Sequence, residues 1–349
     1  MEEVIGGVDT HSAVHCVAAV DSMGRLLGVA EFPASADGYE QLLNWLRRHG
    51  VVERVGVEGT GAYGAGLARC LSDNAITVLE VARPDRRQRR NRGKSDPLDA
   101  EAAARSVLAG TATVVPKGGD GPIEAVRALR VARVGAKKAR TAGLNTLRAM
   151  VITAPVVLRE QLSSVRSGRQ LLRACISLRP DLERMDDPIQ ATKLALRAIA
   201  RRVRDLETEI DELDHQLDRL LSKHAPATFG TFALGRDTAA ALLVAIGDNP
   251  DRLRSERAFA RLCGVAPIPA SSGNTRRHRL HRGGNRSANQ ALHVAVIVRM
   301  RYCQKTRAYV ARRTREGLSK PEIIRCLKRH VAREVFQALR ADYAFMRQI

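Results

Sequence analysis

The sequence lacks any uninterrupted apolar run of about 18 residues, the length that a membrane-spanning helix needs. Its opening stretch, MEEVIGGVD, has no basic segment and reaches acidic residues at once, unlike a secretory signal peptide. The six cysteines include no C-x-x-C pair, so we expect reduced and mostly buried thiols. His11, His15 and Cys16 lie close together, but their spacing matches no zinc signature. These absences predict a cytoplasmic protein with no membrane partner.

Acidic residues are scarce, and so is lysine. The 349 residues include 58 Lys and Arg against 37 Asp and Glu, a formal net charge of +21, and only 9 of the 58 are lysine. The planar guanidinium of arginine suits bidentate contacts with phosphate. A charge of this size repels itself unless a polyanion neutralises it, which predicts nucleic acid as a partner. The length predicts two to three domains.

Strand and helix signals alternate over the first hundred residues. Short apolar runs predict strands at 4–8, 16–20, 26–32, 51–57 and 76–81. Apolar residues at helical spacing predict helices at 37–49 and 63–72, and a further helix follows Asp96. The order β-β-β-α-β-α-β is typical of an α/β fold with a mixed sheet covered by helices, as in the ribonuclease H-like (RuvC-like) architecture. We predict such a domain over residues 1–150.

The rest of the chain is predicted to be mostly helical. A basic helix is expected over residues 121–148, and apolar residues then repeat with heptad spacing from Ile199 to Leu220. This heptad pattern fits a two-stranded coiled coil between chains, and it also fits a helix packed within its own chain. We predict a helical coiled-coil spacer over residues 151–225 and a mostly α-helical C-terminal domain over residues 226–349.

Four carboxylates stand where predicted strands and helices meet. Asp9 ends the first strand and Glu58 the fourth, whereas Asp96 and Asp99 lie three residues apart at a helix start. If the two strands are neighbours, their carboxylates project from one edge of the sheet. Clustered acids repel one another unless a cation binds, and oxygen ligands select Mg²⁺ or Mn²⁺. Such an ion orients phosphates and activates an attacking oxygen.

The same acids have an alternative interpretation. Asp9 and Glu58 are then solvated acids at strand ends, and Asp96 is a helix N-cap with Pro97 and Asp99 as the first and third helical residues. An Asp96→Asn variant separates the interpretations, because asparagine caps a helix as well as aspartate but carries no charge. Retained stability with loss of metal-dependent activity on DNA would support the metal-ligand interpretation.

Two basic segments lie beside residues with possible chemistry. Seven of the twelve positions in residues 83–94 are basic, which predicts a phosphate-binding arm next to Asp96. The other basic segment follows Ser272-Gly273, and a serine that attacks a phosphodiester needs cations to neutralise the developing charge. The residues expected to bind nucleic acid are Arg86, Arg87, Arg89, Arg90, Arg92, Lys94, Arg276, Arg277 and Arg279.

Several motifs together resemble a known family. They are Val8-Asp9-Thr10-His11, Val57-Glu58-Gly59-Thr60-Gly61-Ala62-Tyr63, Gly93-Lys94-Ser95-Asp96-Pro97-Leu98-Asp99-Ala100, Gly264-Val265-Ala266-Pro267, Ser272-Gly273 and Arg282-Gly283-Gly284-Asn285-Arg286. The set resembles the DEDD-type insertion-sequence transposases, which pair a RuvC-like N-terminal domain with a C-terminal domain that carries a serine. The resemblance covers nearly the whole chain, and its third motif is the most specific.

The resemblance implies that Asp9, Glu58, Asp96 and Asp99 bind a divalent metal and that Ser272 is the nucleophile, which forms a covalent bond to a DNA phosphate. It implies that the serine of one domain joins the carboxylates of the other in a composite site. It also implies a homodimer or tetramer, donor and target DNA as substrates, nucleoid association, and a noncoding bridge RNA that specifies both DNAs.

The sequence departs from the family pattern in two places, and other functions fit parts of it. Residues 232–237 replace a Pro-Gly-x-Gly turn, Ser12 replaces a lysine, and Ser271 is a second candidate nucleophile.

Three other functions fit parts of the sequence. In a metal-dependent junction-resolving endonuclease, water attacks the phosphate and Ser272 is only a loop residue. A sugar-kinase or actin-like ATPase would carry a glycine-rich phosphate hairpin around Asp9, which is missing here. A non-catalytic nucleic-acid-binding protein would form no covalent adduct with DNA.

Overall fold

The computed structural model describes residues 2–81, 95–165, 167–273, 278–279, 281 and 283–348. The chain forms two compact units, and each unit is built from two separate segments. The first unit contains Met1–Glu124 and Ala245–Asn285, and the second contains Ala125–Val244 and Arg286–Ile349. The three-part division into domains stays a prediction.

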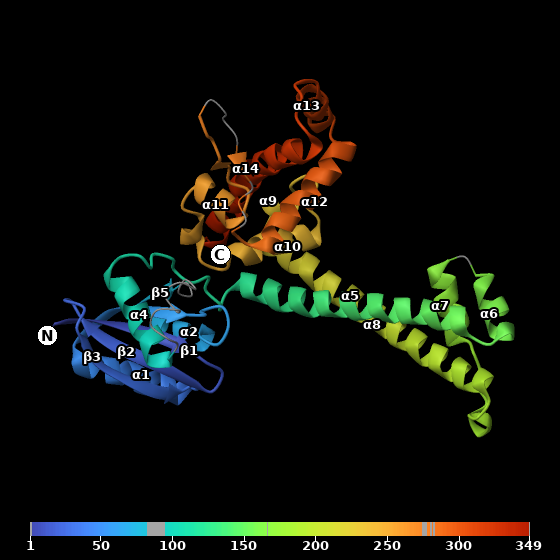
Figure 1. Ribbon diagram of the computed structural model, residues 1–349, viewed down its shortest axis with the longest axis horizontal. Coiled ribbons are helices and arrows are strands. Elements are labelled where there is room, and N and C mark those ends of the chain that lie inside the picture. The colour runs from blue at the N-terminus through green and yellow to red at the C-terminus, as the bar shows by residue number, and fades with distance from the viewer. Residues whose placement is uncertain are drawn as a thin grey trace. The chain divides into compact units, whose positions relative to one another are not determined.

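A five-stranded mixed sheet is the centre of the first unit (Figure 1). Its order is β3-β2-β1-β4-β5, with β1, β2 and β3 antiparallel and with β4 parallel to both β1 and β5. The predicted ribonuclease H-like sheet and its element order are confirmed. The strands are β1 (Glu3–Thr10), β2 (Val14–Asp21), β3 (Leu26–Pro33), β4 (Val51–Glu58) and β5 (Thr77–Val81).

Helices cover both faces of this sheet. On one face α1 (Ala36–His49) and α2 (Ala65–Asp73) pack their leucines against the valines of β1, β2 and β4. On the other face α4 (Asp96–Leu108) packs its alanines against β1, β2 and β5. The central strands β1 and β2 are therefore buried almost throughout, whereas the edge strand β3 is only half-buried.

Small residues allow α4 to approach the sheet very closely. A Cβ atom added to Gly7 would lie 2.1 Å from the backbone nitrogen of Ala104 and 2.2 Å from the carbonyl oxygen of Ala100. A Cβ atom on Gly56 would lie 2.9 Å from the carbonyl oxygen of Ala103. Only glycine fits at such distances from a neighbouring backbone. The close packing brings the start of α4 to the ends of β1 and β4.

The C-terminal segment of the first unit is tied to the end of its N-terminal segment. The Asp248 carboxylate accepts hydrogen bonds from the N–H groups of Ile123 and Glu124, at 2.7 and 3.0 Å. Arg252 donates to the carbonyl oxygen of Val115 at 2.8 Å. The segment contains the 3₁₀ helix Pro250–Leu253, α11 (Glu256–Leu262), β6 (Ile268–Pro269) and β7 (His278–Arg279), and β6 pairs with β7.

The second unit is helical, as predicted for the region after the sheet. Its two long helices, α5 (Pro122–Thr153) and α8 (Pro188–His224), lie side by side (Figure 1), and their leucines and valines share one core. The shorter helices are α6 (Val156–Ser163), α7 (Gly168–Ile176), α9 (Pro226–Phe229), α10 (Arg236–Ile246), α12 (Arg286–Tyr302) and α13 (Gln304–Arg315), and α14 (Lys320–Met346) is longer.

The heptad residues of α8 find partners inside this chain. Val203, Ile210 and Leu217 are buried, and a Cβ atom on Gly143 of α5 would lie 2.8 Å from Val203. Packing within one chain therefore accounts for the burial of these three heptad residues. The interspersed residues, such as Leu206 and Leu213, are half-buried. A coiled coil between two copies of the chain stays a prediction.

The cysteines form no disulfide bonds in the structure. All six cysteines are free thiols, and burial raises the pKa of Cys263 to about 12. Cys16 and Cys175 are also buried, whereas Cys70, Cys303 and Cys326 are half-buried. Within the described ranges, no helix combines the length and the apolarity needed to cross a membrane.

Candidate active site

Asp9 and Glu58 stand at the adjacent C-terminal ends of two parallel strands. Val8 of β1 lies opposite Val57 of β4, so Asp9 and Glu58, the next residues of the two strands, also lie side by side. The Thr10 hydroxyl donates a hydrogen bond of 2.7 Å to the carbonyl oxygen of Glu58, and this bond links the ends of β1 and β4. The predicted neighbourhood of Asp9 and Glu58 at one sheet edge is therefore present.

Strand periodicity directs both acids to the face that α4 covers. Gly7 and Gly56 face α4, and side chains two residues further along a strand point to the same side. These residues are Asp9 and Glu58. Asp9 is almost completely buried, whereas Glu58 is half-buried. The close contact between α4 and the two glycines thus sets how near the first turn of α4 comes to the acids.

Asp96 and Asp99 both lie in the first turn of α4. The interpretation of Asp96 as the N-cap is wrong by one residue, because Ser95 has the extended backbone of an N-cap, with φ of −147°, and the helix begins at Asp96. The N–H groups of Leu98 and Asp99 donate to the Ser95 carbonyl oxygen. The Asp96 carboxylate instead contacts His11, and two acids in a first turn are favoured by the helix dipole.

His11 joins the acids of β1 and α4. Its Nε2 atom lies 3.3 Å from a carboxylate oxygen of Asp9 and 3.4 Å from one of Asp96. The ligand atoms of the three residues all lie within 4.8 Å of one another. The Asp9 side chain is only 10% exposed, whereas those of His11 and Asp96 are nearly half exposed. The cluster is therefore open to solvent on one side and buried on the other.

The acids of this cluster perturb one another. Burial raises the pKa of Asp9, the nearby His11 lowers it, and the charges of Asp96 and Asp99 raise it again. The neighbouring thiol of Cys16 has its pKa raised to about 11, mainly by burial and further by surrounding acids that include Asp96 and Asp9. This face of the sheet therefore carries negative potential that a bound cation would relieve.

The donor set fits a hard divalent cation. Carboxylate oxygens from Asp9 and Asp96 are ligands that Mg²⁺ and Mn²⁺ prefer, and an imidazole nitrogen is an additional possible donor. Sequence reasoning missed His11 in this role, because it weighed His11 only against zinc spacings with His15 and Cys16. The available signal was position, because His11 follows Asp9 by only two residues and lies just past the end of β1 at Thr10.

His15 has a different place from His11. It lies on β2 opposite Thr10, is completely buried, and stacks on Tyr39 with ring centroids 5.6 Å apart. Burial lowers the pKa of His15, so the ring stays neutral inside the fold. His15 is a core residue of the α1 face and takes no part in the cluster.

The serine segment belongs to the same compact unit as the acids. Ser271, Ser272 and Gly273 follow β6 and are exposed, and Gly273 has a positive φ of 54° that favours glycine. Arg279 is exposed on β7, where it pairs with Ile268 of β6. The other predicted nucleic-acid-binding residues lie outside the described residues: Arg86, Arg87, Arg89, Arg90, Arg92, Lys94, Arg276 and Arg277.

Comparison with known families covers both segments that carry these residues. Residues 6–154 match the IS110-type DEDD family described as "Transposase", and they include all four predicted acids. Residues 231–311 match the family described as "Transposase IS116/IS110/IS902 family", and they include Ser272. A search of curated proteins gives no match. Transposases act on DNA, and a DEDD domain implies the use of a divalent metal, as the acid cluster also indicates. The chain belongs to the IS110 family of DEDD transposases.

Proposed function

We propose that this transposase cuts and rejoins DNA through a phosphoserine intermediate on Ser272, beside a metal site formed by Asp9, Glu58, Asp96 and Asp99. The observation that carries the proposal is the convergence of Asp9, His11 and Asp96, whose ligand atoms lie within 4.8 Å of one another. A second support is the exposed Ser272 next to a glycine, in a segment of the same compact unit.

The acids would hold Mg²⁺ or Mn²⁺ through their carboxylate oxygens. A divalent ion at this place supplies positive charge that orients a phosphate and stabilises the charge that develops on it. His11 bridges Asp9 and Asp96, and so it keeps the two carboxylates at a fixed separation. The buried side of the cluster limits water access to Asp9, which strengthens its electrostatic interactions.

In the proposed reaction, the Ser272 hydroxyl oxygen attacks the phosphorus of a DNA phosphodiester. The hydroxyl proton leaves, a bond between phosphorus and the serine oxygen forms, and the bond from phosphorus to the 3′-oxygen breaks. The departing oxygen takes up a proton and becomes a 3′-hydroxyl. A 3′-hydroxyl of the joining strand later attacks the phosphoserine and releases the serine. The covalent bond conserves the energy of the phosphodiester, so the cycle needs no ATP.

Nucleic-acid contacts would come from the basic residues that lie near the acids and near the serine in the sequence. Arg279 is exposed on β7, which pairs with the strand β6 that precedes the serines, and its guanidinium suits a phosphate. The two remaining groups, residues 86–94 and 276–277, are proposed for the same role on their charge alone. We also propose that the serine of the C-terminal domain joins the acids of the N-terminal domain in a composite site, that the protein acts as a dimer or tetramer, and that a noncoding bridge RNA selects the donor and target DNA.

Covalent capture tests the proposed nucleophile. The full chain is incubated with Mg²⁺, DNA that carries the ends of its element, and RNA transcribed from the flanking noncoding DNA. The reaction is then denatured, and the attachment residue of any protein–DNA adduct is mapped by mass spectrometry. We expect the adduct on Ser272, its loss in Ser272→Ala, and its retention in the matched control Ser271→Ala.

Two other results would contradict parts of the proposal. Unchanged cutting by Ser272→Ala without an adduct indicates a junction-resolving nuclease in which water attacks. An adduct on Ser271 would show that the nucleophile is Ser271 and not Ser272.

Asp96→Asn tests the metal site separately. Because Ser95 is the N-cap, the substitution removes a charge without removing a helix cap, so normal folding with loss of DNA cutting is expected. A control reaction without RNA tests the guide.

A further inference from the structure

A basic groove of about 580 Å³ lies along α5 and is lined by residues of the second unit, whereas the acids and the serine belong to the first unit. Its volume is in the range of clefts that hold a nucleotide-sized ligand. The proposed chemistry leaves this groove without a role. The lining residues that matter here are Arg133, Lys137, Lys138, Thr141, Asn145 and Asp237.

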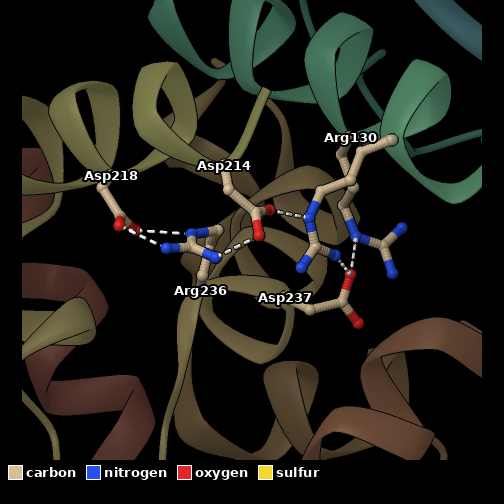
Figure 2. A network of polar contacts seen from close by, with 6 residues as sticks. Arg130, Asp214, Asp218, Arg236 and Asp237 are labelled. Carbon is tan, nitrogen blue, oxygen red and sulfur yellow. Dashed lines mark hydrogen bonds and ion pairs between the residues drawn. The ribbon is translucent and has the colours of Figure 1, made fainter. Parts of the chain in front are cut away.

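Arg133 and Asp237, which line the groove, belong to a network of ion pairs that joins α5, α8 and α10 (Figure 2). Arg133, with only 5% of its side chain exposed, pairs with Asp214 of α8 and lies 3.4 Å from Asp237 of α10. Arg130 contacts the same Asp237 oxygen at 3.4 Å. Arg236 pairs with Asp214 at 2.6 Å and with Asp218. Three arginines thus offset three aspartates.

The rim of the groove keeps an excess of positive charge. Lys137 and Lys138 line it, and α5 carries a single acidic residue, Glu124, at its far N-terminal end. Asn145 lies two turns beyond Lys138 on the same side of the helix and adds an exposed amide. Because Arg133 and Asp237 offset each other in the lining, Lys137 and Lys138 set the net charge that a ligand meets.

Basic residues continue along α5 on either side of the groove. They run from Arg127 to Arg148, which at 1.5 Å per residue is about 30 Å of helix. This length is close to one helical turn of duplex DNA, about 34 Å. Lysine ammonium groups and an amide contact backbone phosphates without reading base identity.

We infer that the α5 groove is a binding site for the phosphate backbone of a nucleic-acid duplex, independent of its sequence. The lining of this site includes none of the proposed catalytic residues, so the inference can be tested independently of Ser272 and the metal. Phosphates from DNA and from RNA offer the same chemistry, and the test therefore uses both.

The test compares full-length wild type with a Lys137→Ala/Lys138→Ala variant. Alanine is the best helix former, so α5 is retained. The matched control, Lys193→Ala/Lys223→Ala, removes two lysines from α8, which do not line the groove. The probes are a DNA duplex and an RNA duplex of arbitrary sequence and roughly 30 base pairs, about three helical turns. Affinity is measured between about 50 and 200 mM salt.

We expect the groove variant to bind on the order of 10- to 100-fold more weakly at 0.1 M salt than wild type and control. Each lost phosphate contact lowers the slope of log affinity against log salt by about 0.9, so a decrease of about 2 is expected. A loss confined to one probe identifies that nucleic acid as the natural occupant, and a loss on both supports a shared site. Slopes equal to those of wild type on both probes would overturn the inference.

A second variant keeps the test decisive if the double variant is poorly folded. Asp237→Asn removes a negative charge from the groove, while Arg133 keeps its partner Asp214. Duplex binding by Asp237→Asn should tighten several-fold, the opposite sign to the lysine variant. Unchanged or weaker binding by this variant, with a wild-type circular dichroism spectrum, would also overturn the inference.

Discussion

Gly7 controls the distance between the sheet and α4, and a single methyl group there should disturb both stability and the acid cluster. In Gly7→Ala the new Cβ meets backbone atoms at 2.1 and 2.2 Å, whereas ordinary contacts begin at 3.4 Å. The helix backbone must therefore retreat by more than about 1 Å, which opens the buried alanine seam. Overpacking of this kind costs about 1–3 kcal/mol, and we expect the upper end because no flexible side chain can yield.

Gly6→Ala is the matched control on the opposite face of the same strand. Its Cβ would meet the side-chain ends of Leu46 and Val55 at 3.0 and 3.1 Å, which can adjust. Alanine also restricts the unfolded chain, a gain of about 0.4–1 kcal/mol, so the net change should stay within about 1 kcal/mol. Urea unfolding at constant m-value measures the two variants.

The same pair of variants tests the connection between packing and the site. If α4 retreats, Asp96 moves away from Asp9 and His11, and Mn²⁺ should bind more weakly to Gly7→Ala than to Gly6→Ala. Equal unfolding free energies for the two variants would refute the reasoning that a backbone contact limits the approach of α4.

Three further predictions concern other parts of the first unit. Burial lowers the pKa of His15 from 6.5, so the unfolded chain takes up a proton at a higher pH than the folded chain does. Wild type should therefore lose stability as the pH falls below about 6.5, and His15→Phe should lose less, as measured by urea unfolding above and below pH 6.5. Asp248→Ala removes the carboxylate that accepts hydrogen bonds from the N–H groups of Ile123 and Glu124 and should lower the free energy of unfolding by about 2 kcal/mol; a change under about 0.5 kcal/mol would contradict the role of this carboxylate. Mn²⁺ should raise the melting temperature of wild type more than that of Asp96→Asn, because an ion that binds only the folded state stabilises it, and equal increases would argue against Asp96 as a ligand.

Local patterns predicted the sheet because its strands are continuous in sequence and bounded by turns. The run from Val4 to Val8 and the alternation from Leu26 to Phe32 both lie within observed strands. The short helices α6, α7, α11 and α13 were not predicted, since none is longer than 12 residues and so few turns define a helical period poorly. The boundary error at Ser95 is of the usual kind, because serine and aspartate are both good N-caps.

The acids of the candidate site were predictable for the same reason, since strand ends and helix starts can be recognised locally. The bridging position of His11 was not, because it depends on how α4 is placed against β1. The attachment of Asp248 to Ile123 was also beyond local reasoning: more than a hundred residues separate the partners, and no short-range pattern signals such a contact.

The discontinuous make-up of the first unit has a consequence for biosynthesis. A ribosome finishes the sheet early, but roughly 120 further residues must be added before the segment that begins at Ala245 emerges, which takes about 6–24 s at ordinary elongation rates. During that interval the amide groups of Ile123 and Glu124 face water instead of a carboxylate. A polypeptide that ends before Ser272 thus carries the acids without the serine, and translation through this segment unites them in one molecule.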